Sequence, residues 1–102
     1  FDYVEYRGER WEVADVRALF NRVMRRAWTD TRAAALSYSA AHGGPIYAET
    51  AWKGQWDELT DGHHLYMGWD SNYMMSAVQG VLDEAGIASE VFVKYSYIGN
   101  VM

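Results

Sequence analysis

Two separate segments of the chain carry the same long apolar pattern, and this pattern limits the fold more than any other feature. In each segment, apolar residues recur at positions i, i+3, i+4, i+7, i+8 and i+11, the spacing of one face of an α-helix. The first stripe is Val16, Leu19, Phe20, Val23, Met24 and Ala27, and the second is Met74, Ala77, Val78, Val81, Leu82 and Ala85. We therefore expect two amphipathic helices, the first starting from Asp15 and the second capped by Asp70 and ended by Gly86.

Alternating side chains predict strands on either side of these helices. Residues 3–6 and 11–13 alternate bulky and charged side chains around a turn at 7–10, which predicts an N-terminal β-hairpin. Residues 64–69 predict a short strand before the second stripe, and residues 89–98 predict another strand after it. If these two strands pair directly, the helix between them makes a parallel crossover, and the alternative is that they flank a third strand.

The segment between the two stripes is less regular. Residues 31–41 predict a further helix, capped by Thr29 or Asp30 and ended by the Gly-Gly-Pro sequence that follows it. Residues 46–48 fit a short strand, and residues 51–59 fit either a helical turn or a loop.

Size and composition favour one globular unit. The chain has 102 residues, of which 50% are hydrophobic and 23% charged, so we expect residues 1–102 to form a single domain around one core. The absence of cysteine excludes disulfides and thiolate sites, and no apolar run approaches the roughly 18 residues of a membrane span. We expect a soluble, cytoplasmic α+β protein: an N-terminal hairpin, two helices and a C-terminal strand-helix-strand unit, with the helices on one face of a small mixed sheet.

Charge is distributed unevenly along the chain. Residues 1–32 hold six acids and seven arginines: Arg7, Arg10, Arg17, Arg22, Arg25, Arg26 and Arg32. Residues 33–102 hold eight acids and only two lysines, which leaves a net charge of −5. This acidic part would repel a nucleic-acid backbone and suits a protein partner with a basic surface, although ordinary solubility explains the same bias. An alternative hypothesis is that the arginines of the first helix bind nucleic acid.

The histidines are the side chains whose ordinary pKa lies nearest neutrality. His63, His64 and Asp61 are close in sequence and could form the acid/base pair or metal site of a small hydrolase. However, the metalloprotease spacing HExxH is absent, and adjacent histidines in a strand face opposite sides. The sequence also lacks a GxSxG elbow and a phosphate-binding glycine loop, so we expect no metal and no cofactor and keep the hydrolase as an alternative.

Aromatic residues are in excess, with five Trp, eight Tyr and three Phe. We do not expect so small a domain to bury all of these rings, and surface Trp and Tyr are enriched at binding hot spots. The candidate partner-binding residues lie in the poorly periodic middle of the chain: Tyr47, Glu49, Trp52, Trp56, Asp57, Glu58, Asp61 and Tyr66. The alternative is a satellite core beneath a long loop.

These observations favour a non-enzymatic domain that binds another protein, as a small inhibitor, adaptor or subunit. They are the lack of a catalytic motif, the excess of Trp and Tyr, and the acidity after residue 32. Small proteins that phages and other mobile elements encode against host defence enzymes have a similar size and charge, which is an argument by analogy. A third hypothesis is that the aromatic residues bury against a second copy of the chain.

Overall fold

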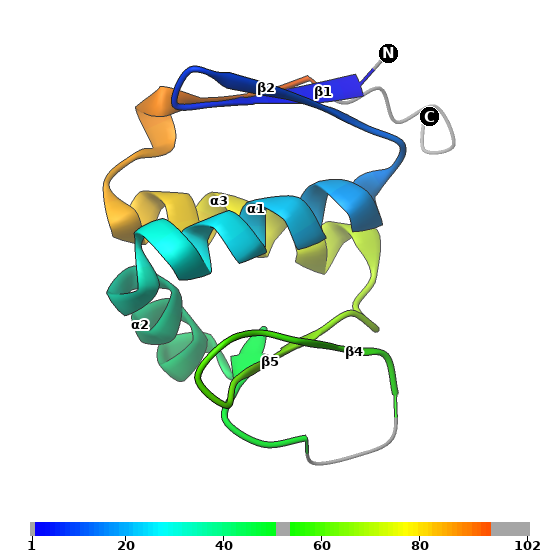
Figure 1. Ribbon diagram of the computed structural model, residues 1–102, viewed down its shortest axis with the longest axis vertical. Coiled ribbons are helices and arrows are strands. Elements are labelled where there is room, and N and C mark those ends of the chain that lie inside the picture. The colour runs from blue at the N-terminus through cyan, green and yellow to red at the C-terminus, as the bar shows by residue number, and fades with distance from the viewer. Residues whose placement is uncertain (1, 51–53, 95–102) are drawn as a thin grey trace.

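Helices α1 and α3 form the central layer of the protein (Figure 1). The computed structural model describes residues 2–50 and 54–94. Helix α1 spans Val16–Asp30 and helix α3 spans Ser71–Ala85, and the two pack against each other. All residues of the two predicted stripes are buried except Ala85, which is half-buried and packs against the core. Both predicted helices are therefore confirmed.

The ends of these helices are set by the expected side chains. The Asp15 carboxylate accepts a hydrogen bond from the backbone N–H of Ala18 at 2.8 Å, and the Asp70 carboxylate accepts one from the N–H of Tyr73 at 2.7 Å. Each bond satisfies an N–H that has no partner within the helix. Helix α3 ends at Gly86, whose φ of 73° is left-handed and favours glycine.

A three-stranded antiparallel sheet, sheet A, covers one side of the helix pair (Figure 1). It consists of β1 (Asp2–Tyr6), β2 (Glu9–Val13) and β6 (Val91–Lys94), in the order β2-β1-β6. The turn between β1 and β2 contains Arg7 and Gly8, both with positive φ, as tight hairpin turns require. The inward side chains of β1 and β2 are buried in the core: Val4, Tyr6, Trp11 and Val13.

A second antiparallel sheet, sheet B, lies on the other side of the helices (Figure 1). It consists of β3 (Ile46–Tyr47), β4 (Trp56–Glu58) and β5 (His64–Tyr66), in the order β3-β5-β4. Ile46 and Leu65 lie opposite each other and are buried in the core, which fixes the face that sheet B turns towards the helices.

Helix α2 spans Arg32–His42 and packs against α3. The two helices approach closely where Gly80 of α3 meets the buried ring of Tyr38. Among the described residues, no helix has the length and the apolar content that crossing a bilayer would require.

The start of α2 corrects one prediction. The N-cap residue is Thr31, whose side chain makes no capping hydrogen bond, whereas Thr29 and Asp30 belong to the last turn of α1. The Asp30 carboxylate instead accepts hydrogen bonds from the Tyr6 hydroxyl at 3.3 Å and from Arg26 at 3.2 Å. Asp30 therefore ties α1 to sheet A.

The α+β class, the N-terminal hairpin and the C-terminal strand-helix-strand order are confirmed, but the strands form two antiparallel sheets and not one mixed sheet. Strand β6 pairs with β1, while β5 pairs with β3 and β4, so neither a direct parallel pair nor a shared third strand connects β5 to β6. Of the strand predicted over 89–98, residues 91–94 form β6, residues 88–90 form a 3-10 turn, and residues 95–98 lie outside the described residues.

Candidate functional site

Five side chains share the outer face of sheet B, and we call this set the sheet B aromatic face: Tyr47, Trp56, Glu58, His64 and Tyr66. In the strand register, Tyr47 and Glu58 both lie opposite His64, and Trp56 lies opposite Tyr66. Residues opposite each other in antiparallel strands, and residues two apart in one strand, point to the same side of a sheet. All five side chains therefore lie on the face of sheet B opposite to that of the buried residues Ile46 and Leu65.

Trp56 is the centre of this face. Its ring centroid lies 4.9 Å from that of Tyr66, 5.5 Å from that of Tyr47 and 6.3 Å from that of His64. These separations are within the range of favourable aromatic pairs. All four residues are half-buried, so the rings form one continuous surface that is partly open to solvent.

The aromatic contacts continue from this face towards helix α3. The rings of Tyr66 and Trp69 meet edge to face at 5.1 Å, and those of Trp69 and Tyr73 stack at 3.9 Å. Because Tyr73 belongs to α3, the outer aromatic surface is backed by the central helix layer.

Glycines hold the tyrosine rings close to the backbone. A Cβ atom on Gly54 would lie 2.8 Å from the ring of Tyr66, and one on Gly68 would lie 2.3 Å from its hydroxyl oxygen. A Cβ atom on Gly44 would likewise lie 2.4 Å from the hydroxyl oxygen of Tyr47. Contacts this short leave no space for a side chain, so these glycines allow the rings to lie against the main chain.

The predicted acidic residues divide into two groups. Asp57 accepts a hydrogen bond from Asn21 and lies 3.4 Å from Arg25, so its carboxylate is directed at α1. Asp61 forms an ion pair with Arg32. Both carboxylates therefore tie the segment around sheet B to α1 and α2.

Glu49 and Glu58 form the second group. Both are exposed, and neither makes an ion pair with a described residue. Glu58 lies on the sheet B aromatic face itself. Trp52, the remaining predicted site residue, lies outside the described residues.

Tyr47 stays neutral at physiological pH. Burial raises the pKa of its hydroxyl above the ordinary value, and repulsion from Tyr66 adds to this effect. Its hydroxyl donates a hydrogen bond to the carbonyl oxygen of Gly43. The negative charge near the aromatic face is therefore carried by carboxylates.

The residues of the alternative hydrolase site have separate contacts. The ring of His63 packs on Trp28 with centroids 4.8 Å apart, while His64 belongs to the sheet B aromatic face. The Asp61 carboxylate is held by Arg32, and only its backbone carbonyl approaches His63, at 3.0 Å from Nδ1. In the described part of the chain, no three His, Asp or Glu side chains form a group that could hold a metal ion.

Most arginines are paired within the protein. Five of the seven form ion pairs with acids: Arg7 with Glu90, Arg10 with Glu5, Arg25 with Asp57, Arg26 with Glu9 and Asp30, and Arg32 with Asp61. Arg17 donates a hydrogen bond to the carbonyl oxygen of Met67 at 2.6 Å. The internal acids offset much of the positive charge that a nucleic-acid interface would use, and this alternative remains a prediction.

Sequence reasoning missed two contributors to the aromatic surface. The sequence singles out His64 only for the alternative hydrolase site and does not single out Trp69, which is half-buried beside Tyr66. His64 and Tyr66 alternate with buried Leu65 along β5, and this alternation alone predicts that His64 lies on the outer face.

Comparison with protein-family models, with curated proteins and with solved structures finds no match for this chain. The function is therefore argued from the geometry of the chain itself.

Proposed function

We propose that this chain is a non-enzymatic protein-binding domain, acting as a small inhibitor, adaptor or subunit, and that the sheet B aromatic face contacts a basic surface of its partner. The observation that carries the proposal is that Tyr47, Trp56 and Tyr66 form one partly exposed surface, with the carboxylate of Glu58 on the same face.

The aromatic rings suit a binding surface because they are large and held in place. Trp and Tyr dominate interface hot spots, since they bury much area with little loss of side-chain freedom. The close approach of Gly54 and Gly68 to Tyr66 restricts that ring further. A partner would therefore meet a surface whose order is largely established before binding.

The charge pattern indicates the chemistry of the partner. Glu49 and Glu58 are exposed, and residues 33–102 hold eight acids against two lysines. An arginine side chain can place its guanidinium over the face of an aromatic ring and its N–H groups on a carboxylate at the same time. A partner surface that carries arginines complements both features of the sheet B aromatic face.

The test uses three synthetic peptides that alternate glycine with arginine, lysine or glutamate. In ¹H–¹⁵N NMR spectra, we expect the arginine peptide to shift the indole N–H signal of Trp56 in a saturable manner, the lysine peptide to bind more weakly, and the glutamate peptide not to bind. Truncation of a hot-spot tryptophan typically costs at least about 2 kcal/mol, so Trp56→Leu should weaken binding of the arginine peptide by about thirtyfold or more.

A second variant and two controls keep the test decisive. Glu58→Lys retains the aromatic rings but reverses the charge, and it should weaken the arginine peptide while the backbone spectrum shows an intact fold. Phe92→Ala and Glu12→Lys make the matching changes at exposed positions of sheet A and should leave binding unchanged.

Three outcomes would contradict the proposal. One is equal binding of the arginine and glutamate peptides. Another is a set of shifts centred on Phe92 and not on Trp56. The third is a dimer in sedimentation equilibrium that Trp56→Leu dissociates, which would assign the face to a second copy of the chain.

A further inference from the structure

Among the described residues, four arginines lie over aromatic rings, and this shared arrangement allows them to be compared. The distances from the guanidinium carbon to the ring centroid are 3.7 Å for Arg10 over Tyr3, 4.9 Å for Arg22 over Trp11, 5.4 Å for Arg26 over Trp11 and 4.4 Å for Arg32 over Trp28. A guanidinium that stacks on a ring uses its flat face, which leaves the N–H donors at its edge available for oxygen atoms.

Three of these four guanidiniums have a carboxylate partner. Arg10 lies 3.9 Å from Glu5, Arg26 binds both carboxylate oxygens of Glu9 and also Asp30, and Arg32 binds Asp61. Arg22 makes no hydrogen bond or ion pair with any described residue. It is the stacked arginine whose edge donors have no acceptor within the described protein.

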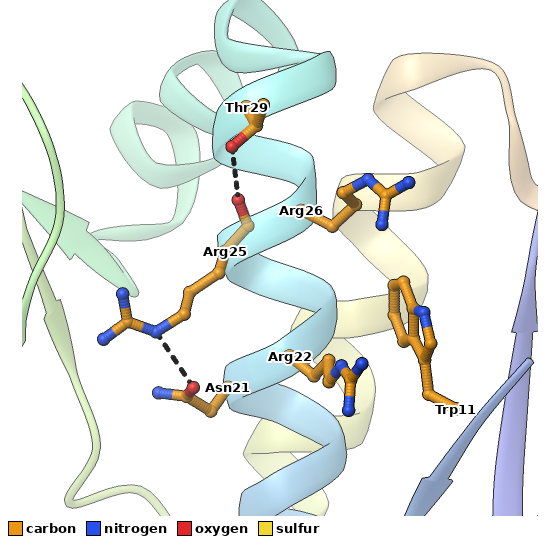
Figure 2. Close-up of a pocket in the computed structure, with 6 residues that line it drawn as sticks. All are labelled: Trp11, Asn21, Arg22, Arg25, Arg26 and Thr29. Carbon is orange, nitrogen blue, oxygen red and sulfur yellow. Dashed lines mark hydrogen bonds between the residues drawn. The ribbon is translucent and has the colours of Figure 1, made fainter. Parts of the chain in front are cut away.

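Arg22 lines a hollow that runs along the exposed side of α1, next to Trp11 of β2 (Figure 2). The hollow has a volume of about 270 Å³, and its lining contains no acid: Trp11, Asn21, Arg22, Arg25, Arg26 and Thr29. Figure 2 shows the side chains of Arg22 and Arg26 on the side of α1 that faces Trp11, and that of Arg25 on the opposite side. The Arg25 Nε–H donates a hydrogen bond to Oδ1 of Asn21 at 3.0 Å, and the guanidinium also forms an ion pair with Asp57.

The ring beneath Arg22 is itself fixed. Trp11 is buried, stacks on Tyr6 with centroids 5.1 Å apart, and donates its indole N–H to Glu9 at 3.3 Å. Both carboxylate oxygens of Glu9 accept hydrogen bonds from Arg26, and Glu9 makes no hydrogen bond with Arg22. Arg22 itself is exposed, and its guanidinium lies over this fixed ring with its N–H donors open to solvent.

We propose that this hollow binds a small oxyanion, a carboxylate or a phosphate group, through two parallel hydrogen bonds from the edge of the Arg22 guanidinium. Arg26 shows a comparable arrangement already completed by Glu9, since its guanidinium lies over the same ring and binds two oxygens of one carboxylate. Paired N–H···O bonds of this kind are the preferred arginine contact with both anions. The site is independent of the sheet B aromatic face.

The test follows the Nε–H signal of Arg22 in ¹H–¹⁵N NMR spectra during titration with inorganic phosphate, acetate or chloride at constant ionic strength. We expect a saturable shift with a dissociation constant that is roughly millimolar, because one arginine pair supplies most of the contact. A response to phosphate alone would identify a phosphate site, and an equal response to acetate would identify a general oxyanion site. Both outcomes support the proposal.

The variant Arg22→Lys tests whether anion binding needs the two parallel donors of the guanidinium or only its positive charge. Lysine keeps the charge but lacks the two parallel donors, so the saturable response, followed by backbone amides around the hollow, should weaken at least about fivefold. Arg10→Lys is the matched control, because it changes a stacked arginine on the outer face of sheet A, and it should leave the response unchanged.

The proposal is overturned if chloride gives the same saturable shift, if no anion gives one, or if Arg22→Lys responds as the wild type does. Trp56→Leu should leave anion binding intact, so a failure of this site and a failure of the proposed partner surface can be told apart.

Discussion

Tyr73 carries a buried hydroxyl that has no hydrogen-bond partner among the described residues. Its ring stacks on Trp69, and burial raises the pKa of the hydroxyl, with smaller contributions from repulsion by Tyr47 and Tyr38. A buried polar group that has lost its hydrogen bonds to water and gained no others lowers stability. The ring of Tyr73 therefore stabilises the fold, while its hydroxyl opposes it.

Replacing this tyrosine with phenylalanine should raise stability. At neutral pH, we expect Tyr73→Phe to increase the free energy of unfolding by about 1 kcal/mol, because it removes the unsatisfied hydroxyl and keeps the ring. Urea unfolding monitored by circular dichroism measures this difference. Tyr3→Phe, on the outer face of sheet A, is the matched control, and equal effects of the two changes would contradict the argument.

The same group predicts how stability depends on alkaline pH. Below about pH 10, Tyr73 keeps its proton in both the folded and the unfolded state, so it contributes no pH dependence. Above that pH, the unfolded chain loses the proton first, which stabilises the unfolded state and lowers the free energy of unfolding. The wild type should therefore lose up to about 1.4 kcal/mol per pH unit more than Tyr73→Phe, measured by urea unfolding at increasing pH. Parallel curves for the two proteins would exclude this role of Tyr73.

Gly80 is a second residue at which the addition of one atom, a Cβ, should change the stability of the fold. A Cβ atom there would lie 2.2 Å from Cε2 of Tyr38, a ring that is buried and stacked on His42 with centroids 4.0 Å apart. Alanine would improve helix propensity by about 1 kcal/mol, whereas overpacking costs about 1–3 kcal/mol. We expect Gly80→Ala to lower the free energy of unfolding by up to about 2 kcal/mol, measured by urea unfolding, since the clash with Tyr38 outweighs the gain in helix propensity.

Two variants test the cause of that loss. Gln79→Ala changes the exposed neighbour on α3 and should leave stability almost unchanged. In a Tyr38→Ala background, Gly80→Ala should cease to be destabilising. A loss of the same size in that background would show that the contact with Tyr38 is not responsible.

At the scale of elements, the start of α3 depends on one side chain. The Asp70 carboxylate accepts the backbone N–H of Tyr73, and loss of such a cap typically costs about 1 kcal/mol. Asp70→Ala should lower the urea midpoint accordingly, while Asp70→Asn should retain most of the stability because it keeps an acceptor oxygen. If both variants lose the same stability, the charge of Asp70 at the helix N-terminus matters more than its hydrogen bond.

The helices could be predicted from the sequence, but the strand partners could not. The stripes of α1 and α3 are local patterns, and the capping residues Asp15 and Asp70 lie next to them, so short-range information was sufficient. The pairing of β6 with β1 joins segments at opposite ends of the described chain, and β4 contains only three residues. Alternation predicts that a strand is half-buried but carries no information about which strand lies beside it.

The candidate site was predicted only in part, for a related reason. The sequence singled out Trp56, Tyr66 and Tyr47, and the strand register places them on one face. It did not separate Glu58, which lies on that face, from Asp57, which contacts α1, because β4 was not predicted as a strand. Whether this face binds a partner remains a prediction.

At the scale of the whole molecule, the helix layer lies between two sheets of unequal size. Helix α1 contributes seven buried residues to the core, whereas the strands of sheet B span only two or three residues each. Local opening is easiest where few apolar contacts and few backbone hydrogen bonds must break.

Native-state hydrogen exchange should measure the difference in local stability between α1 and sheet B. We expect amides in the middle of α1, such as those of Phe20 and Val23, to exchange only through global unfolding. The amides of β4 and β5 should exchange through a local opening whose free energy is lower by at least about 2 kcal/mol. Equal protection of α1 and sheet B would contradict this order, and Gly80→Ala should lower the protection of α1 by its full effect on stability.

The pairing of β1 with β6 has a consequence for synthesis of the chain on the ribosome. The hairpin of β1 and β2 is made first, yet its third strand follows only after both sheet B and α3 have been translated. Until residues 91–94 emerge, the nascent hairpin lacks a neighbour along one edge, and such an edge can pair with other chains. Sheet A is therefore completed late in translation, and a ribosome that pauses before β6 would hold a chain in which the β1 edge that β6 later covers is still unpaired.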